Sequence, residues 1–204
     1  MRWTAEKLNL HRQIVSSFGF DPYLDFLSGI ILAQYIKNDL WKLLPEVREA
    51  NIIGPRDPPE DLDGYNIVAD SALNYYQGRF QMLVTDLDGP IERIISSSKD
   101  GKYIVVHAHG DNIDKILEYV PQLQGNILGT TQSIPVRNVR NIGGFTDGDR
   151  SVLMAAILGA KEINIYGFDF ENPVDEPKNI KAKKMKFARE IIEKLKNIRI
   201  QYIQ

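Results

Sequence analysis

Two acidic residues follow a short apolar run near the middle of the chain. The run is Met82-Leu83-Val84; Asp86 and Asp88 come after it, and Gly89 and Pro90 then turn the chain away. A buried strand that ends in carboxylates is unfavourable unless a cation or a proton neutralises them. Hard cations such as Mg²⁺ prefer oxygen ligands and are bound through one or two carboxylates together with substrate phosphates. The spacing therefore predicts a metal site, with an ordinary turn after a strand as the alternative.

Other apolar runs in the chain also end in polar residues. They are Ile67–Ala69 with Asp70 and Ser71, Ile104–Val106 with His107, His109 and Asp111, and Ile163–Gly167 with Phe168 and Asp169. In sheets of parallel strands, ligands bind outside the carboxyl ends of the strands. Several strands that end in acids therefore predict one metal-and-phosphate site along a single sheet edge.

The segment from Val105 to Asn112 holds two of the three histidines of the chain. In an extended segment His107 and His109 lie on the same side, and Gly110, Asp111 and Asn112 follow them. This spacing permits a transition-metal site with imidazole and carboxylate ligands. It equally permits a phosphate-binding or orienting role, and Asp111 as a helix N-cap is the structural alternative.

A glycine-rich segment, Asn141 to Arg150, combines flexibility with charge just before an expected helix. Its candidate residues are Gly143, Gly144, Phe145, Thr146, Asp147, Asp149 and Arg150. Backbone N–H groups at a helix N-terminus attract phosphate, and an arginine there can neutralise developing charge. The structural alternative is a long loop with a helix cap at Asp147 or Asp149.

Elements of alternating type must position these residues. Short strands are expected at 50–54, 65–69, 81–85, 103–107, 126–128, 136–141, 162–166 and 198–203, and helices at 72–77, 91–97, 113–123, 150–158 and 180–196. Strands that are apolar on both faces and alternate with helices predict an α/β fold with a mainly parallel sheet flanked by helices. Residues 1–49 read as a helical N-terminal extension, with Pro22 in a first turn, and residues 50–204 as the α/β catalytic domain.

Composition narrows the classes of function. The 204 residues carry a formal net charge of −2, so the charge balance does not favour nucleic acid as a partner. The chain has no cysteine, which excludes disulfides and thiolate metal sites. No apolar run approaches the roughly 18 residues of a membrane span, and the N-terminal residues lack the apolar core of a signal peptide. We therefore expect a cytoplasmic protein without membrane or nucleic-acid partners, and a homodimer stays open.

Taken together, the motifs resemble those of a known family. They are Asp70-Ser71-Ala72, Thr85–Gly89, His107–Asn112, Gly143–Arg150 and Gly167–Phe170, in this order. As a set they resemble the archaeal 6-hydroxymethyl-7,8-dihydropterin diphosphokinases of the MptE type, relatives of the thiamine pyrophosphokinase fold, over about residues 50–170. The resemblance implies transfer of the β,γ-diphosphate of ATP to the pterin hydroxymethyl with release of AMP, with Mg²⁺ as cofactor, in folate or methanopterin-type cofactor biosynthesis. Residues 53–58 depart from the pattern, where a smaller Gly-Pro-Ser-like turn is expected near the nucleotide.

The resemblance also suggests a role for each residue. The metal ligands would be Asp86, Asp88 and Asp149, and the catalytic group would comprise Asp86, Asp88, Asp147, Asp149 and Arg150. Asp147 or Asp149 would either hold a second ion or help to deprotonate the hydroxymethyl. Contacts with ATP would come from Asp70, Ser71, His107, His109, Gly110, Asp111 and Asn112. Contacts with the pterin would come from Gly143, Gly144, Phe145, Thr146, Phe168 and Asp169, with Phe145 stacking on the ring and Phe168 as its rival.

Other functions remain open at this point. The segment Leu83–Gly89 is also similar to the nucleophile motif of haloacid-dehalogenase-type phosphatases, although Pro90 and the acid at Asp70 do not fit that family. A pyrophosphokinase for another acceptor, such as thiamine, would use the same residues. A non-catalytic nucleotide- or metal-binding module is an alternative from a different class. No Walker-type phosphate loop is present, so a kinase of that type is not indicated.

Overall fold

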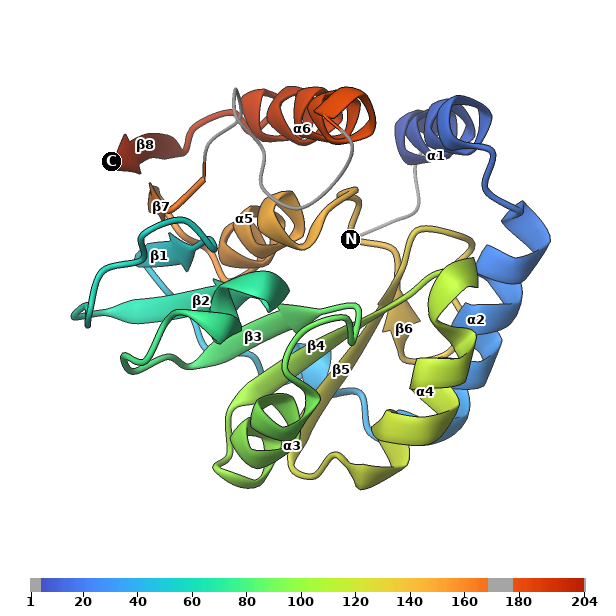
Figure 1. The fold of residues 1–204 in the computed structure, drawn as a ribbon, viewed down its shortest axis with the longest axis horizontal. Coiled ribbons are helices and arrows are strands. Elements are labelled where there is room, and N and C mark those ends of the chain that lie inside the picture. The colour runs from blue at the N-terminus through green and yellow to red at the C-terminus, as the bar shows by residue number, and fades with distance from the viewer. Residues whose placement is uncertain (1–4, 169–177, 204) are drawn as a thin grey trace. The chain divides into compact units, whose positions relative to one another are not determined.

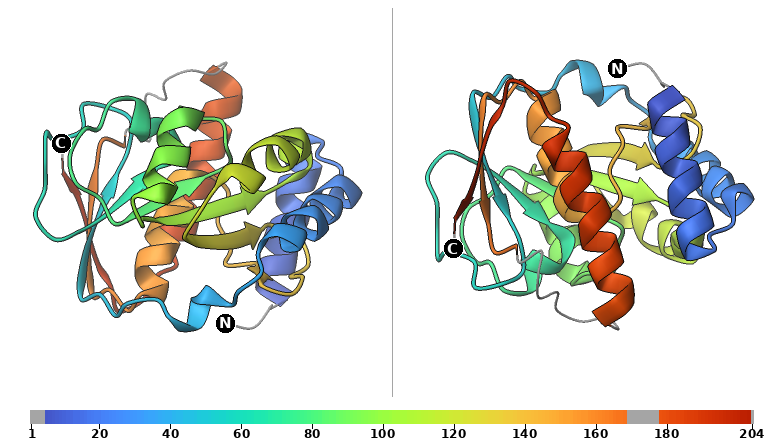
Figure 2. Two further views of the ribbon diagram at one scale, coloured as in Figure 1. Left: turned by 90° about the horizontal axis from the view of Figure 1, so that it is seen from below. Right: turned by 90° about the horizontal axis from the view of Figure 1, so that it is seen from above.

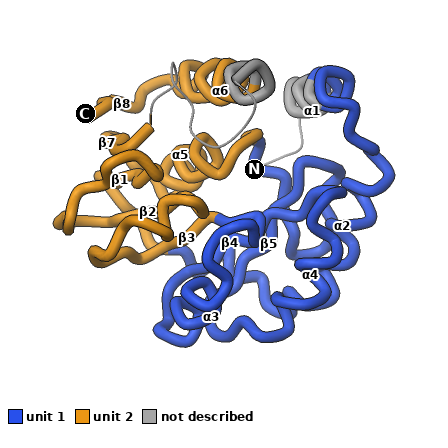
Figure 3. The backbone as a smooth tube through the Cα atoms, viewed as in Figure 1, with its two compact units in different colours: residues 1–44, 85–143 blue, residues 45–84, 144–204 orange. Residues whose placement is uncertain are grey.

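The computed structural model describes residues 5–168 and 178–203, and the chain divides into two compact units (Figure 3). Unit 1 comprises residues 1–44 and 85–143, and unit 2 comprises residues 45–84 and 144–204. Each unit therefore combines segments that are distant in the sequence. The expected domain boundary at residue 49 stays a prediction. Figure 1 labels the elements, which are described below for each unit in turn.

Unit 2 contains parallel strands in the order β3-β2-β1-β7-β8. The strands are β1 (Glu49–Ile53), β2 (Tyr65–Ala69), β3 (Met82–Thr85, of which residues 82–84 belong to this unit), β7 (Glu162–Tyr166) and β8 (Arg199–Ile203). Ile52 of β1 is fully buried and pairs with Ile67 on one side and Ile165 on the other. Strands that are apolar on both faces need cover on both faces, which explains their near-continuous apolar runs.

Helices and a short 3₁₀ segment complete unit 2. They are η2 (Asp70–Asn74), α5 (Asp147–Ile157) and α6 (Lys178–Glu193). Helix α5 packs against β1 and β2, and α6 lies along α5, as the views of Figure 2 show. Val152 and Met154 of α5 are almost fully buried, so this helix packs closely against the sheet. This packing fixes the position of its first residue, Asp147.

A row of amide side chains crosses four neighbouring strands of unit 2. Asn66, Asn51, Asn164 and Gln201 occupy paired positions on β2, β1, β7 and β8. The Asn51 amide donates to the Asn66 side-chain oxygen at 2.8 Å, and the Asn164 amide donates to the Asn51 oxygen at 3.1 Å. A slip of one residue would separate these partners and move each strand's apolar side chains to the other face. The row therefore fixes the register of the strands whose ends carry the candidate residues.

Unit 1 has the parallel strand order β6-β5-β4. Its strands are β4 (Tyr103–Ala108), β5 (Asn126–Thr131) and β6 (Val139–Arg140), and its helices are α1 (Ala5–Phe18), α2 (Pro22–Tyr35), α3 (Ile91–Lys99) and α4 (Ile113–Tyr119), with the 3₁₀ segments η1 (Leu40–Lys42), η3 (Gly110–Asn112) and η4 (Val120–Gln122). Helix α2 packs against β4, β5, α4 and η3, and α3 packs against β4. Asp21 caps α2 by accepting from the Tyr23 N–H, and Pro22 opens the helix as expected.

The expected α/β class is confirmed, because every strand pair described within the two units is parallel and helices pack against the strands. Two local expectations were wrong. The segment 136–141 forms strand only at Val139–Arg140, and the expected helix 72–77 is a 3₁₀ turn that starts at Asp70. Among the described residues, no helix is both long enough and apolar enough to cross a bilayer.

Candidate active site

An acidic residue follows each of the strands β2 and β3, and the two strands end at the same level of the sheet. Ala69 of β2 pairs with Val84 of β3, so Asp70 and Asp86 leave the strands close to the same edge. Asp70 begins η2 and is only 3% exposed. Burial of a carboxylate is unfavourable unless a cation or hydrogen-bond donors compensate for its lost hydration. The ends of the two strands therefore indicate a site that attracts positive charge.

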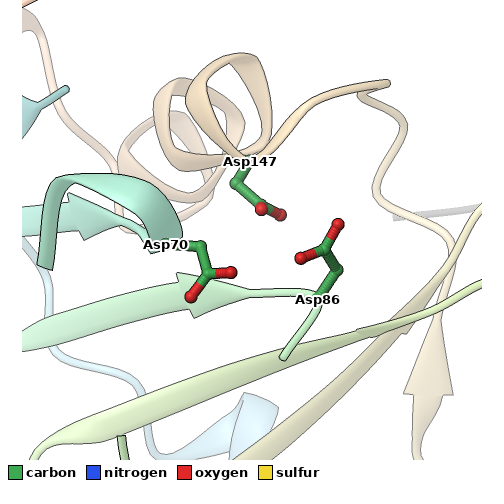
Figure 4. Close-up of side chains that lie close together, drawn as sticks. All are labelled: Asp70, Asp86 and Asp147. Atoms are coloured by element: carbon green, nitrogen blue, oxygen red, sulfur yellow. The ribbon is translucent and has the colours of Figure 1, made fainter. Parts of the chain in front are cut away.

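Asp147, the first residue of α5, completes a cluster with Asp70 and Asp86. Each offers a carboxylate oxygen, and these three oxygens lie within 4.8 Å of one another. Figure 4 shows the three carboxylates directed toward a common centre. Like charges this close disfavour one another's ionised forms unless a cation joins them. The all-oxygen donor set suits Mg²⁺.

Asp88 lies outside this cluster and has a different partner. Its exposed carboxylate forms an ion pair with Lys115 of α4, and its backbone N–H donates to Asp86 Oδ1 at 3.3 Å. Between the two acids, Leu87 is buried and has a φ of 69°, in the left-handed region that residues other than glycine rarely adopt. The Leu87 N–H donates to the Thr85 side-chain oxygen at 2.8 Å. Because of this turn, the carboxylates of Asp86 and Asp88 have different partners although the two residues are close in the sequence.

The segment after β4 orients Asp86. The Asn112 amide donates to the Asp86 backbone oxygen at 2.8 Å and to the His107 backbone oxygen at 2.7 Å. The Asn112 side-chain oxygen accepts from the His109 N–H at 3.1 Å. His109 Nδ1 accepts from the Asp111 N–H, so the neutral ring carries its proton on Nε2, which lies 3.7 Å from Asp86 Oδ2. His109 thus lies close to the side chain of Asp86, and Asn112 binds the backbone of the same residue.

His107 and His109 do lie on the same side of their segment, with ring centroids 6.0 Å apart. His107 is 2% exposed, and its Nδ1 lies 3.1 Å from the Thr130 hydroxyl, which itself lies within hydrogen-bonding distance of the Val106 carbonyl. The His107 ring is therefore part of the interior between β4 and β5. The ring presents little surface to a ligand. The expected contact of His107 with the nucleotide stays a prediction.

Asp149 holds the first turn of α5. Its carboxylate accepts from the Phe145 N–H at 2.8 Å and from the N–H and hydroxyl of Thr146, both at 2.6 Å. The Thr146 hydroxyl in turn accepts from the Asp149 N–H, which completes a capping box. Asp149 is 1% exposed, and burial raises the pKa of its carboxyl although Arg150, Thr146 and Phe145 act in the opposite direction. Both Asp149 oxygens are thus used inside the turn.

Arg150 binds Asp147. Its Nη1 donates to Asp147 Oδ1 at 2.7 Å, and the arginine side chain is 2% exposed. Gly144, at a φ of +90°, passes so close that a Cβ there would lie 3.2 Å from the Arg150 Cβ. Ser151 also donates to the Asp147 backbone oxygen at 2.6 Å. Hydrogen bonds therefore fix both the side chain and the backbone of Asp147.

Phe168 packs into a space that two glycines leave open. A Cβ on Gly54 would lie 2.6 Å from the Phe168 ring, and a Cβ on Gly148 would overlap the same ring. Gly54 follows β1 and Gly148 is the second residue of α5, so the ring connects the strand end with the helix that carries Asp147. Phe168 remains partly exposed, which is compatible with the expected contact to a flat ligand.

Phe145 packs against helix α6. Its ring makes an edge-to-face contact with Phe187 of α6, with centroids 6.0 Å apart, and it is 9% exposed. Little of this ring is available for stacking on a substrate. Of the two aromatic residues considered for stacking, Phe168 has the more accessible ring.

The remaining expected residues have varied surroundings. Ser71 and Asp111 are exposed, and the Gly143 N–H donates to the Asn141 side-chain oxygen at 2.9 Å. Asp169 lies outside the described residues. One residue near this site was not expected from the sequence: Asp25, buried within α2, accepts from the Gly110 N–H. Its signal was an acid within the apolar stretch Tyr23–Leu32.

Comparisons with known proteins place this arrangement in context. No family model matches the chain. Three curated archaeal proteins are similar to it, and each is named 6-hydroxymethyl-7,8-dihydropterin pyrophosphokinase. The protein from Methanocaldococcus jannaschii is 34% identical over 95% of this chain and 96% of its own length. The protein from Pyrococcus furiosus is 45% identical over 66% of this chain and 63% of its own length. For the protein from Methanothermobacter thermautotrophicus the identity is 55%, over 44% and 38% respectively. The chain belongs to the family of 6-hydroxymethyl-7,8-dihydropterin pyrophosphokinases.

Proposed function

We propose that this chain is a magnesium- and ATP-dependent 6-hydroxymethyl-7,8-dihydropterin diphosphokinase. It transfers the β,γ-diphosphate of ATP to the hydroxymethyl oxygen of the pterin and releases AMP. The observation that carries this proposal is the similarity to the Methanocaldococcus jannaschii pyrophosphokinase along nearly the whole of both chains. The cluster of Asp70, Asp86 and Asp147 supports it, since diphosphoryl transfer depends mainly on positioning and on neutralising phosphate charge.

In this reaction the hydroxymethyl oxygen attacks the β-phosphorus of ATP. The bond from that phosphorus to the oxygen bridging it to the α-phosphate breaks, AMP leaves with that oxygen, and the hydroxyl proton passes to solvent. A bound Mg²⁺ supplies charge neutralisation on the phosphates. We assign its ligation to Asp70, Asp86 and Asp147, in place of the set with Asp88 and Asp149 that the sequence indicated. Asp149 has its two oxygens occupied within its own turn, so we assign it to holding the start of α5.

The direct test is analysis of the adenine products. Purified protein is incubated with ATP, Mg²⁺ and 6-hydroxymethyl-7,8-dihydropterin, and the nucleotides are separated. AMP should form only when the pterin is present, and EDTA should abolish it. Asp86→Asn should lower the rate by roughly 10²–10³-fold, because it removes a proposed ligand of the ion that neutralises the phosphates. The exposed Asp114 of α4 provides a matched control, and Asp114→Asn should leave the rate unchanged.

Asp88→Asn distinguishes the two metal-ligand sets. If Asp88 pairs with Lys115 at the surface, its replacement should change the rate by less than about threefold, as expected for an exposed ion pair. A loss as large as that of Asp86→Asn would restore the ligand set with Asp88. Formation of ADP or free phosphate would reject diphosphoryl transfer and favour a phosphatase. Formation of AMP with thiamine but not with the pterin would show that the acceptor is thiamine.

A further inference from the structure

Asp25 is a buried carboxylate in the first turn of α2, and it holds two separate segments. It is 2% exposed and lies in an otherwise apolar part of the helix. One of its oxygens accepts from the Gly110 N–H at 2.8 Å, and the other accepts from the Gln132 side-chain amide at 2.8 Å. A buried acid without such partners is strongly destabilising, so these hydrogen bonds help to compensate for lost hydration. The partners lie 85 and 107 residues away in the sequence.

The first partner belongs to the segment that orients Asp86. Gly110 sits so close to α2 that a Cβ there would lie 2.8 Å from the Leu24 Cβ and 3.4 Å from the Asp25 nitrogen. Gly110 is preceded by His109, whose Nε2 faces Asp86 Oδ2 at 3.7 Å. A shift of Gly110 would therefore move His109.

The second partner leads to the glycine-rich segment. The backbone oxygens of Gln132 and Ser133 accept from the Asn141 amide at 2.8 and 2.9 Å. The Asn141 side-chain oxygen accepts from the Gly143 N–H at 2.9 Å. Fixing Gln132 therefore also fixes the residues that lead into Gly143. The two oxygens of one carboxylate thus hold the two segments of unit 1 that contain expected ligand-binding residues.

We propose that Asp25 is a positioning residue of the active site, which fixes residues 109–112 through Gly110 and residues 132–143 through Gln132. The inference rests on the proposed function for its kinetic consequences. It makes helix α2 part of the machinery that orients Asp86. Outer partners of this kind typically change metal affinity or activity by about 10–100-fold when they are replaced.

A reciprocal exchange of amide and carboxylate provides the test. In Asp25→Asn the side chain keeps one acceptor oxygen, so Gly110 or Gln132 loses its acceptor. In the double variant Asp25→Asn with Gln132→Glu, the new amide donates to the new carboxylate while its oxygen still accepts from Gly110. Asp25→Asn should raise the KM for Mg·ATP or lower kcat by roughly tenfold, and the double variant should recover most of the loss. Asp21→Asn, at the exposed cap of the same helix, is the matched control and should behave as the wild type.

A second measurement does not depend on activity. The nitrogen chemical shifts of the His109 ring report its tautomer in the protein without nucleotide, and the chain has only three histidines. The wild type and the double variant should show the proton on Nε2, and Asp25→Asn should show a mixture of tautomers. If Asp25→Asn matches the wild type in both measurements, or the double variant improves on it in neither, the proposal is rejected. If the wild type forms no AMP with the pterin, the proposed function fails, while the His109 measurement still tests the role of Asp25.

Discussion

Single residues with unusual surroundings define this site. Asp147 and Arg150 are separated by one helical turn, and the guanidinium is buried against the carboxylate. The sequence suggested that Arg150 would offset phosphate charge, and that role stays a prediction. The geometry favours a different one, because a side chain that is 2% exposed and already bonded to Asp147 is well placed to orient that carboxylate.

Replacing Arg150 tests this orienting role. Arg150→Met removes the donor to Asp147 Oδ1, and we expect kcat/KM for Mg·ATP to fall by roughly 10–100-fold. Arg150→Lys should retain part of the activity, because an ammonium can still donate to one oxygen but lacks the planar fork. Steady-state kinetics at several Mg²⁺ concentrations would measure both variants.

The control for these variants is Arg189→Met on α6. Arg189 is exposed and pairs with Glu193 at the surface, so its replacement should leave the kinetics within about twofold of the wild type. An Arg150→Met protein with unchanged dependence on Mg²⁺ would show that Asp147 does not need this partner.

At the scale of elements, strand ends and helix starts bring the candidate residues together. The sequence identified β2 and β7 with the limits that the structure has, because each is a short, nearly continuous apolar run. Its expectation for 136–141 was wrong, since Val136 pairs only through an isolated bridge with Val139 and the strand is confined to two residues. Local apolar pattern does not reveal how long a strand at the end of its sheet keeps a partner.

The amide row of unit 2 leads to a prediction about stability. Asn66 is fully buried, and its amide also donates to the Leu62 and Arg79 backbone oxygens at 2.8 Å. Asn66→Leu removes the donor to these two oxygens and one of the acceptors of the Asn51 amide, so we expect a loss of about 1–3 kcal/mol in the free energy of unfolding. Urea unfolding would measure the loss. Asn74→Ala, at an exposed position, should change it by less than about 0.5 kcal/mol.

An Asn66→Leu protein as stable as the wild type would mean that the row does not hold the strands in register. A change in the slope of the urea transition, without a change in its midpoint, would instead indicate that the compactness of the unfolded chain has changed.

At the scale of the whole molecule, the cluster of acids should couple the stability of the fold to a bound cation. Asp70, Asp86 and Asp147 come from three parts of the chain, and folding brings their negative charges within 4.8 Å. Any ligand that binds only the folded chain stabilises it by mass action. The same three residues should therefore link stability to magnesium.

We expect Mg²⁺ to raise the melting temperature of the wild type and to have little effect on Asp147→Asn. Without metal, Asp147→Asn should melt at a lower temperature than the wild type, because the buried Arg150 guanidinium loses its charged partner. At a free Mg²⁺ concentration about 100-fold above its dissociation constant, the stabilisation should be about 2.7 kcal/mol. Calorimetry with EDTA and with Mg²⁺ would measure both effects. An equal shift in both proteins would place the bound ion elsewhere.

The sequence by itself determined the α/β class, most of the strands, and the fact that acids follow several of them, because apolar periodicity and turn chemistry are local properties of the chain. It also carried the motifs of the pterin pyrophosphokinase family, to which the full-length similarity assigns the chain. Only the tertiary structure decided which acids come together. Asp86 and Asp88 are neighbours in the sequence, but the turn at Leu87 sends one toward Asp70 and Asp147 and the other to Lys115. Asp25 could not be found locally, since its partners are contributed by other segments in the folded chain.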